Sequence, residues 1–199
     1  MKTHLYYGNG GLLFALAALV LGAWWCTGRP YAELGLSWAE PPYDFVAVGL
    51  LTAFLGLYLL DVFRQLSTAE GRAGTRAELR SLGFMPTTAT QFLNFIFLAV
   101  AAGVSEEIVF RGFLMTYGFD VLGAGGWKTV AVLLLPAVSF ALGHFYQGWR
   151  AVLKIIVMAV LFGYFFWRTG TLWPLILLHA AIDVFGGLLS WYLLGHRRD

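Results

Sequence analysis

Long apolar runs separated by short polar stretches dominate the chain. Six runs can be marked, at residues 12–25 (longer if 5–11 are included), 45–63, 91–119, 130–145, 151–167 and 172–194. About 20 apolar residues are enough for a helix to cross the hydrocarbon core of a bilayer. The pattern therefore predicts an all-α, polytopic bundle of about six transmembrane helices. No small-residue cleavage site follows the first run, so we interpret that run as a retained span rather than a signal peptide.

The third run and the stretch before it need separate treatment. Residues 67–90 are the most polar part of the chain and predict a loop or a short helix on the membrane surface. A helix over residues 91–119 would be about 43 Å long at about 1.5 Å per residue, against a core of roughly 30 Å. We therefore expect this helix to tilt, to break or to end in an interfacial piece. A seventh, re-entrant piece at 112–126 is an alternative.

Composition supports a membrane protein. Of 199 residues, 59% are hydrophobic and 12% are charged, and the mean hydropathy is +0.73, whereas soluble domains carry about 25% charged residues. The length suits a single integral-membrane domain over residues 1–199. A net charge of +2, without a basic aromatic patch, argues against a nucleic-acid partner. Cys26 is the only cysteine, which rules out an intramolecular disulfide and argues against a cysteine metal site.

Lysine and arginine are unevenly divided between the two ends of a six-span bundle. If both termini share one side, nine lie on that side and three on the other: Lys2, Arg64, Arg72, Arg76, Arg80, Arg150, Lys154, Arg197 and Arg198 against Arg29, Lys128 and Arg168. Cytoplasmic loops are enriched in these residues. We therefore expect both termini in the cytoplasm, and a bacterial cytoplasmic membrane as the location.

Apart from Asp61 and Lys154, which we interpret as interfacial residues near the ends of their runs, three of the apolar runs contain charged or imidazole side chains. These are Glu106, Glu107, Arg111, His144, His179 and Asp183. Charged groups are costly inside a bilayer, and where they occur they usually face a bundle interior or a water-filled cavity. We therefore expect the three runs to converge on one polar cavity.

Helical spacing separates the roles of the two adjacent acids. Glu107 and Arg111 are four residues apart with the acid first, which is the favourable order for an ion pair on one helix face. Glu106 points about 100° away and lacks that partner, so it is available as a general base. His179 and Asp183 are also four apart and share a face.

These residue types can hydrolyse an amide. Glu106 together with His144 could activate a water molecule, while His179 and Asp183 hold the carbonyl of the scissile bond. Each group also has a structural interpretation, because buried ion pairs can fix helix register and a histidine near a helix end is common interfacial packing. Their coincidence on three separate runs, which hold few other polar residues, favours a shared site.

The three motifs, taken in order, resemble a known family. Glu106-Glu107-x-x-x-Arg111, Phe140-x-x-x-His144 and His179-x-x-x-Asp183 are similar to the motifs of the CPBP family, the CAAX-protease and bacteriocin-processing group of intramembrane glutamic endopeptidases. The resemblance covers residues 91–189, the expected catalytic core. The family's third motif often ends in asparagine, whereas this chain has Asp183.

The resemblance implies a reaction and a set of roles. It implies cleavage of a membrane-anchored protein or peptide, close to its C terminus, without metal or other cofactor. Glu106 and His144 would activate water, and His179 with Asp183 would stabilise the oxyanion. Glu107, Arg111 and Phe140 would support them.

Two alternatives belong to other classes of protein. A zinc peptidase could use Glu106, His144 and His179 as ligands, although the chain has no His-Glu-x-x-His element. A non-catalytic immunity, scaffold or transporter-like protein could keep the polar groups for packing or proton movement. One feature fits a plain six-span bundle badly, since Glu106 falls towards the far end of the third run and His144 near the cytoplasmic end of the fourth. Contact between them requires a bent or deeply set third helix, or a funnel.

Overall fold

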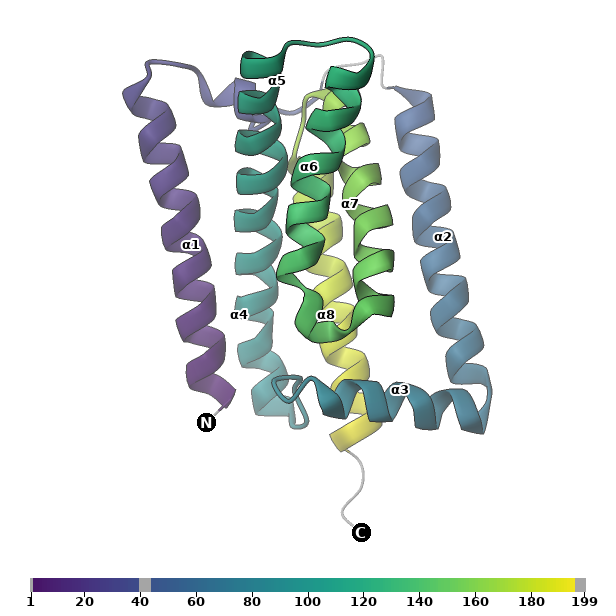
Figure 1. Ribbon diagram of the computed structural model, residues 1–199. Helices are drawn as coiled ribbons and strands as arrows, with labels where there is room; N and C mark the ends of the chain where they lie inside the picture. Colours follow the sequence, from purple (N-terminus) through teal and green to yellow (C-terminus); the bar gives the residue numbers. More distant parts are fainter. Residues whose placement is uncertain (1, 40–43, 196–199) are drawn as a thin grey trace.

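The computed structural model describes residues 2–39 and 44–195. In this part of the chain the ordered elements are all helical, as Figure 1 shows. In chain order they are α1 (Lys2–Cys26), η1 (Tyr31–Leu34), α2 (Phe45–Ser67), α3 (Ala69–Ser81), α4 (Ala89–Glu106), η2 (Glu107–Met115), α5 (Thr116–Leu122), α6 (Trp127–Gly143), η3 (Phe145–Gln147), α7 (Trp149–Thr169) and α8 (Trp173–Gly195). Arg197 and Arg198, two of the nine cations counted above, lie outside the described residues.

The predicted all-α membrane bundle is confirmed. Five helices in the described residues are long and apolar enough to cross a membrane, and α6, the fourth run, is a shorter apolar helix. These helices run alternately up and down, so that Lys2 and Gly195 lie at the same end of the bundle (Figure 1). The protein is an integral membrane protein.

The third run forms one long helix. α4, η2 and α5 follow one another without interruption over Ala89–Leu122, a helix of 34 residues. The Thr88 side chain caps it by accepting a hydrogen bond from the Gln91 N–H, and it ends at Gly123, whose φ of 77° suits glycine. The alternative of a re-entrant piece at 112–126 is therefore wrong. The helix does not break; its backbone widens to a π-helix over η2.

The polar stretch before this helix contains the expected surface helix. α3 lies across the lower end of the bundle, from the end of α2 to below α8 (Figure 1). The Thr68 hydroxyl accepts from the Gly71 N–H at 3.0 Å, which starts α3 directly after α2.

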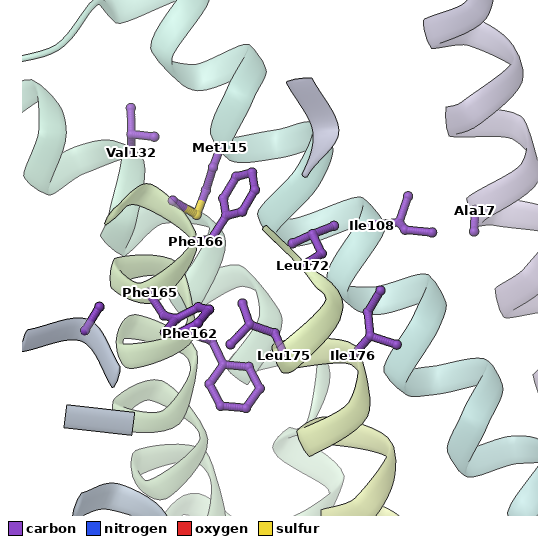
Figure 2. Packing of buried hydrophobic residues seen from close by; sticks show 11 residues of the cluster. Ala17, Ile108, Met115, Val132, Phe162, Phe165, Phe166, Leu172, Leu175 and Ile176 are labelled. Atoms are coloured by element: carbon purple, nitrogen blue, oxygen red, sulfur yellow. The ribbon is translucent and has the colours of Figure 1, made fainter. Parts of the chain in front are cut away.

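A close helix contact holds the bundle together beside the ionisable residues. A Cβ added to Gly103 on α4 would lie 2.8 Å from the Ala180 backbone nitrogen on α8, so only glycine allows this approach. Further up, Met115, Phe162, Phe166, Leu172 and Leu175 fill the space between η2, α7 and α8, as Figure 2 shows. The core thus fixes α4, η2, α7 and α8 relative to one another.

Helix α2 lies at the edge of the bundle. Only 6% of the 18-residue apolar stretch of α2 is buried inside the structure, compared with 44% of the corresponding stretch of Ala89–Leu122. Two ion pairs join it to α7, Asp61 to Lys154 at 2.9 Å and Asp44 to Arg168 at 2.6 Å. Hydrogen bonds from the Ala47 N–H and from Arg168 lower the pKa of the Asp44 carboxyl. Between these ion pairs an apolar cavity of about 320 Å³ separates α2 from α7 and the start of α8.

Candidate active site

The centre of the site is a buried ion pair on the π-helical segment. Glu107 Oε1 accepts from Arg111 Nη1 at 2.9 Å, as the spacing predicts, and the two side chains are 0% and 2% exposed. The guanidinium also lies 4.8 Å from the ring centre of Phe140 and 5.4 Å from that of Phe162. π-Helical turns are rare and often mark functional sites.

His179 connects this pair to the other two acids. Its Nδ1 lies 2.8 Å from Glu107 Oε1, and because an ionised carboxylate only accepts, Nδ1 carries the hydrogen. The opposite nitrogen, Nε2, is 3.5 Å from Glu106 Oε2 and 3.8 Å from Asp183 Oδ2. Helices α4, η2 and α8 therefore place three carboxylates around one imidazole.

His144 lies at the end of α6 and is oriented by its own helix. Its Nδ1 is 2.8 Å from the Phe140 carbonyl oxygen, which can only accept, so Nδ1 donates and Nε2 remains available. His144 makes no ion pair with Glu106 within 4 Å, but it lies within electrostatic range of His179 and Asp183. The structure thus brings the fourth and sixth runs to the same region.

Phe140 packs between the two histidines. Its ring is 2% exposed, and its centre lies 4.6 Å from the His144 ring and 6.0 Å from the His179 ring. Because the same ring also covers the Arg111 guanidinium, one buried side chain fixes the relative positions of three ionisable groups. Phe140 therefore contacts an ionisable residue of each of the three motifs.

The depth mismatch between Glu106 and His144 is resolved by helix lengths. Glu106 is the last residue of α4, midway along the 34-residue helix rather than towards its far end. Helix α6 has only 17 residues, and the turn that joins it to α7 stops well above α3 (Figure 1). His144 therefore lies inside the bundle, at the depth of the acids.

Two of the acids remain partly accessible. Glu106 is 16% exposed and Asp183 36%, although both belong to the interior of apolar helices. Within the described residues, Glu106 Oε2 is enclosed but accepts no hydrogen bond. It can therefore accept one from a small molecule such as water.

Two tyrosines near the site were missed by the sequence reasoning. Tyr146 stacks on His144 with ring centres 6.0 Å apart and interacts electrostatically with Glu106 and Asp183. Tyr58, on α2, interacts electrostatically with Asp183 and Asp61. The position of Tyr146, two residues after His144, was a signal available in the sequence, whereas nothing marked Tyr58.

In residues 2–39 and 44–195, no group of three or more His, Cys, Asp and Glu side chains is arranged to hold a metal ion. The site offers instead a hydrogen-bonded set of carboxylates and imidazoles, which is suited to moving protons and stabilising charge.

Comparison with known families assigns this core. Residues 88–185 match the family model described as type II CAAX prenyl endopeptidase Rce1-like. These residues belong to the CAAX protease family. The matched region contains every ionisable group of the site and leaves out α1, α2 and α3, so the CAAX protease core comprises the helices from α4 to α8. No curated protein matches the chain, and no solved structure does.

Proposed function

We propose that this CAAX protease family member is an intramembrane endopeptidase that hydrolyses a peptide bond with a water molecule activated by Glu106 and His144. The observation that carries the proposal is the position of His179, whose two nitrogens face Glu107 at 2.8 Å and Glu106 at 3.5 Å. An acid without a hydrogen-bond partner, next to an oriented imidazole, is the arrangement that general base catalysis needs.

The first step adds water to the scissile carbonyl. Glu106 accepts a proton from the water, and the resulting hydroxide attacks the carbonyl carbon. In its cationic form His179 offers an Nε2–H to the developing oxyanion, because its Nδ1–H is held by Glu107. Asp183, 3.8 Å from Nε2, keeps that cation in place and orients it.

The second step breaks the carbon–nitrogen bond. The tetrahedral intermediate collapses, and the leaving amine takes the proton that Glu106 accepted from water, either directly or relayed through Nε2 of His144. One product carries the new carboxylate and the other the new amine, so the site returns to its starting protonation state. Neither step requires a group that the chain itself lacks.

The substrate in this proposal is a protein or peptide held at the membrane. The site lies inside a bundle of apolar helices, and Glu106 and Asp183 keep part of their side-chain surface exposed. We propose that both termini face the cytoplasm of a bacterial cell, since Arg64, Arg72, Arg76 and Arg80 all lie at the end where the chain begins.

The decisive experiment replaces Glu106, the proposed general base, by glutamine, which has the same shape. Purified Glu106→Gln protein in lipid nanodiscs should lose at least about 100-fold in hydrolysis of a lipid-anchored peptide pool, as general base catalysis supplies about 10²- to 10⁴-fold. Asp61→Asn, a control on α2 outside this set of acids, should hydrolyse the pool at the normal rate. If Glu106→Gln folds and hydrolyses normally, the protein is not a protease of this kind.

Treatment with chelators distinguishes the proposed mechanism from that of a zinc peptidase. Activity of the wild-type protein should persist after exhaustive treatment with EDTA and 1,10-phenanthroline, and should not rise on adding Zn²⁺. Loss of activity that Zn²⁺ restores would replace the Glu106 mechanism by a metal-bound water.

A further inference from the structure

Arg76 is a half-buried cation for which the described part of the chain provides no hydrogen-bond or ion-pair partner. It lies on the half-buried face of α3 together with Gly71, Arg72, Thr75 and Leu79. In the part of the chain that the structure describes, its Nε is enclosed by protein and has no hydrogen-bond partner. Among the described residues, no carboxylate lies within ion-pair distance of its guanidinium, although four other Lys and Arg side chains have one. The fold therefore holds Arg76 against protein, although no described residue forms an ion pair or a hydrogen bond with it.

The position of Arg76 follows from the contacts of its own helix. Arg72, one turn earlier, donates to the Leu66 carbonyl at the end of α2. Leu79, almost one turn later, packs into the same apolar cluster as Val184 of α8, the residue after Asp183. Arg76 therefore lies on the half-buried face of α3, between a residue that contacts α2 and one that packs with α8. The helix itself runs from the end of α2 to below α8 (Figure 1).

The two helices that α3 contacts, α2 and α8, also carry groups at the edge of the candidate site. Tyr58 of α2 and Asp183 of α8 are close enough to interact electrostatically, and Asp183 is 36% exposed. Asp61 is already paired with Lys154. An anion that enters between α2 and α8 would therefore find Arg76 as the unpaired cation on its lower side.

Arg80, on the same helix, is an exposed interfacial arginine and can be compared with Arg76. It lies one turn further along α3 and is exposed, so its guanidinium is free to reach lipid headgroups or water. Arg76 differs because its face of the helix points to protein and its Nε is enclosed. The two residues form a matched pair for an experiment.

We propose that Arg76 binds the free C-terminal carboxylate of the substrate and so selects cleavage close to a chain end. A guanidinium holds a carboxylate through two parallel N–H···O bonds, which gives both strength and orientation. The proposal rests on the proteolytic function proposed above. It adds a specificity residue on α3, outside the region that matches the family model.

The first test compares free and blocked chain ends. The probe is a pool of lipid-anchored fluorogenic peptides with four randomised C-terminal positions, prepared as the free acid and as the amide. In neutral phosphatidylcholine nanodiscs, wild-type protein should have a kcat/KM about 10- to 100-fold higher for the acid, the range expected for hydrogen bonds to a charged group. Arg76→Gln should lower the acid value to that of the amide, mainly through KM, and leave the amide value unchanged.

Control variants distinguish the loss of the Arg76 charge from a loss of folding. Arg76→Lys should recover part of the preference for the acid, and Arg80→Gln should keep all of it. A thermal unfolding midpoint for Arg76→Gln equal to that of the wild type shows that the helix is intact. Equal Glu106-dependent hydrolysis of acid and amide by the wild type would overturn the role of Arg76 and leave the protease itself standing.

The second test measures binding without turnover. Glu106→Gln protein should bind the fluorescent acid pool more tightly than the amide pool, and adding Arg76→Gln should remove the difference. This result is independent of catalysis, so equal binding overturns the inference even if no hydrolysis is found. If Arg76→Gln instead changes only the response to added phosphatidylglycerol, equally for both pools, the guanidinium binds a lipid phosphate and the proposal is wrong.

Discussion

Glu107 and Arg111 illustrate how one buried charge pair can position a reactive group. Glu107 Oε1 accepts from both Arg111 Nη1 at 2.9 Å and His179 Nδ1 at 2.8 Å. Arg111 holds the carboxylate in place, and the carboxylate fixes which His179 nitrogen carries a hydrogen. The pair is thus a positioning device for the imidazole, and its effect on stability and on activity can be separated.

Breaking the pair should cost more than removing it. Arg111→Met leaves Glu107 buried without its cation, which typically destabilises a protein by about 3–5 kcal/mol. The double variant Glu107→Leu with Arg111→Met should unfold closer to the wild type, because neither member of the Glu107–Arg111 pair is left without the other and His179 keeps Glu106 and Asp183 as neighbours. Thermal unfolding in detergent measures both. Neither variant should be active, since the double variant removes the Nδ1 partner of His179 and Arg111→Met removes the guanidinium that fixes the position of Glu107. An active double variant would remove the positioning role.

Residue spacing predicted this pair but not the whole arrangement around it. The i to i+4 spacings of Glu107 with Arg111, and of His179 with Asp183, follow from helix geometry alone. The contact between Glu107 and His179 joins residues 72 positions apart and depends on how α8 packs on η2. The proximity of Tyr58 to Asp183 likewise depends on the placement of a peripheral helix, which no local pattern records.

Helix α4 and helix α8 form the element pair on which the site depends. Gly103 lies three residues before Glu106, and Ala180 one residue after His179, so their contact sets the distance between these two functional side chains. The apolar runs revealed both helices, but hydropathy carries no information on how closely they approach. Hydropathy likewise did not predict that α6 is short, and therefore did not predict the depth of His144 in the bundle.

A single methyl group should test this contact. In Gly103→Ala the new Cβ would lie 2.8 Å from the Ala180 nitrogen, so α4 and α8 must separate. Overpacking of this kind typically costs about 1–3 kcal/mol, and hydrolysis should fall because Glu106 moves away from His179. Gly11→Ala on α1, where the structure has nothing within 4 Å, should unfold no earlier than the wild type and remain active. Equal behaviour of the two variants in unfolding and hydrolysis assays would show that the contact is not tight.

At the scale of the whole molecule, burial divides the bundle into a core and two peripheral helices. In α1 17% and in α2 6% of the 18-residue apolar stretch is buried inside the structure. The corresponding share is 28–44% for the long helices that carry or support the site. The region that matches the family model begins at residue 88, after both peripheral helices. Substrate access and orientation in the membrane are therefore the features that α1, α2 and α3 can determine.

The orientation can be tested with the one native cysteine. Cys26 is exposed at the end of α1 opposite to Lys2. If the N terminus is cytoplasmic, a membrane-impermeant maleimide added to intact spheroplasts should label Cys26 in the wild-type protein. In a Cys26→Ser variant that carries Ser81→Cys, at the end of α3, labelling should occur only after the membrane is permeabilised. The reverse pattern would place α3, and with it Arg76, on the outer face, so that a substrate carboxylate would have to approach from outside the cell.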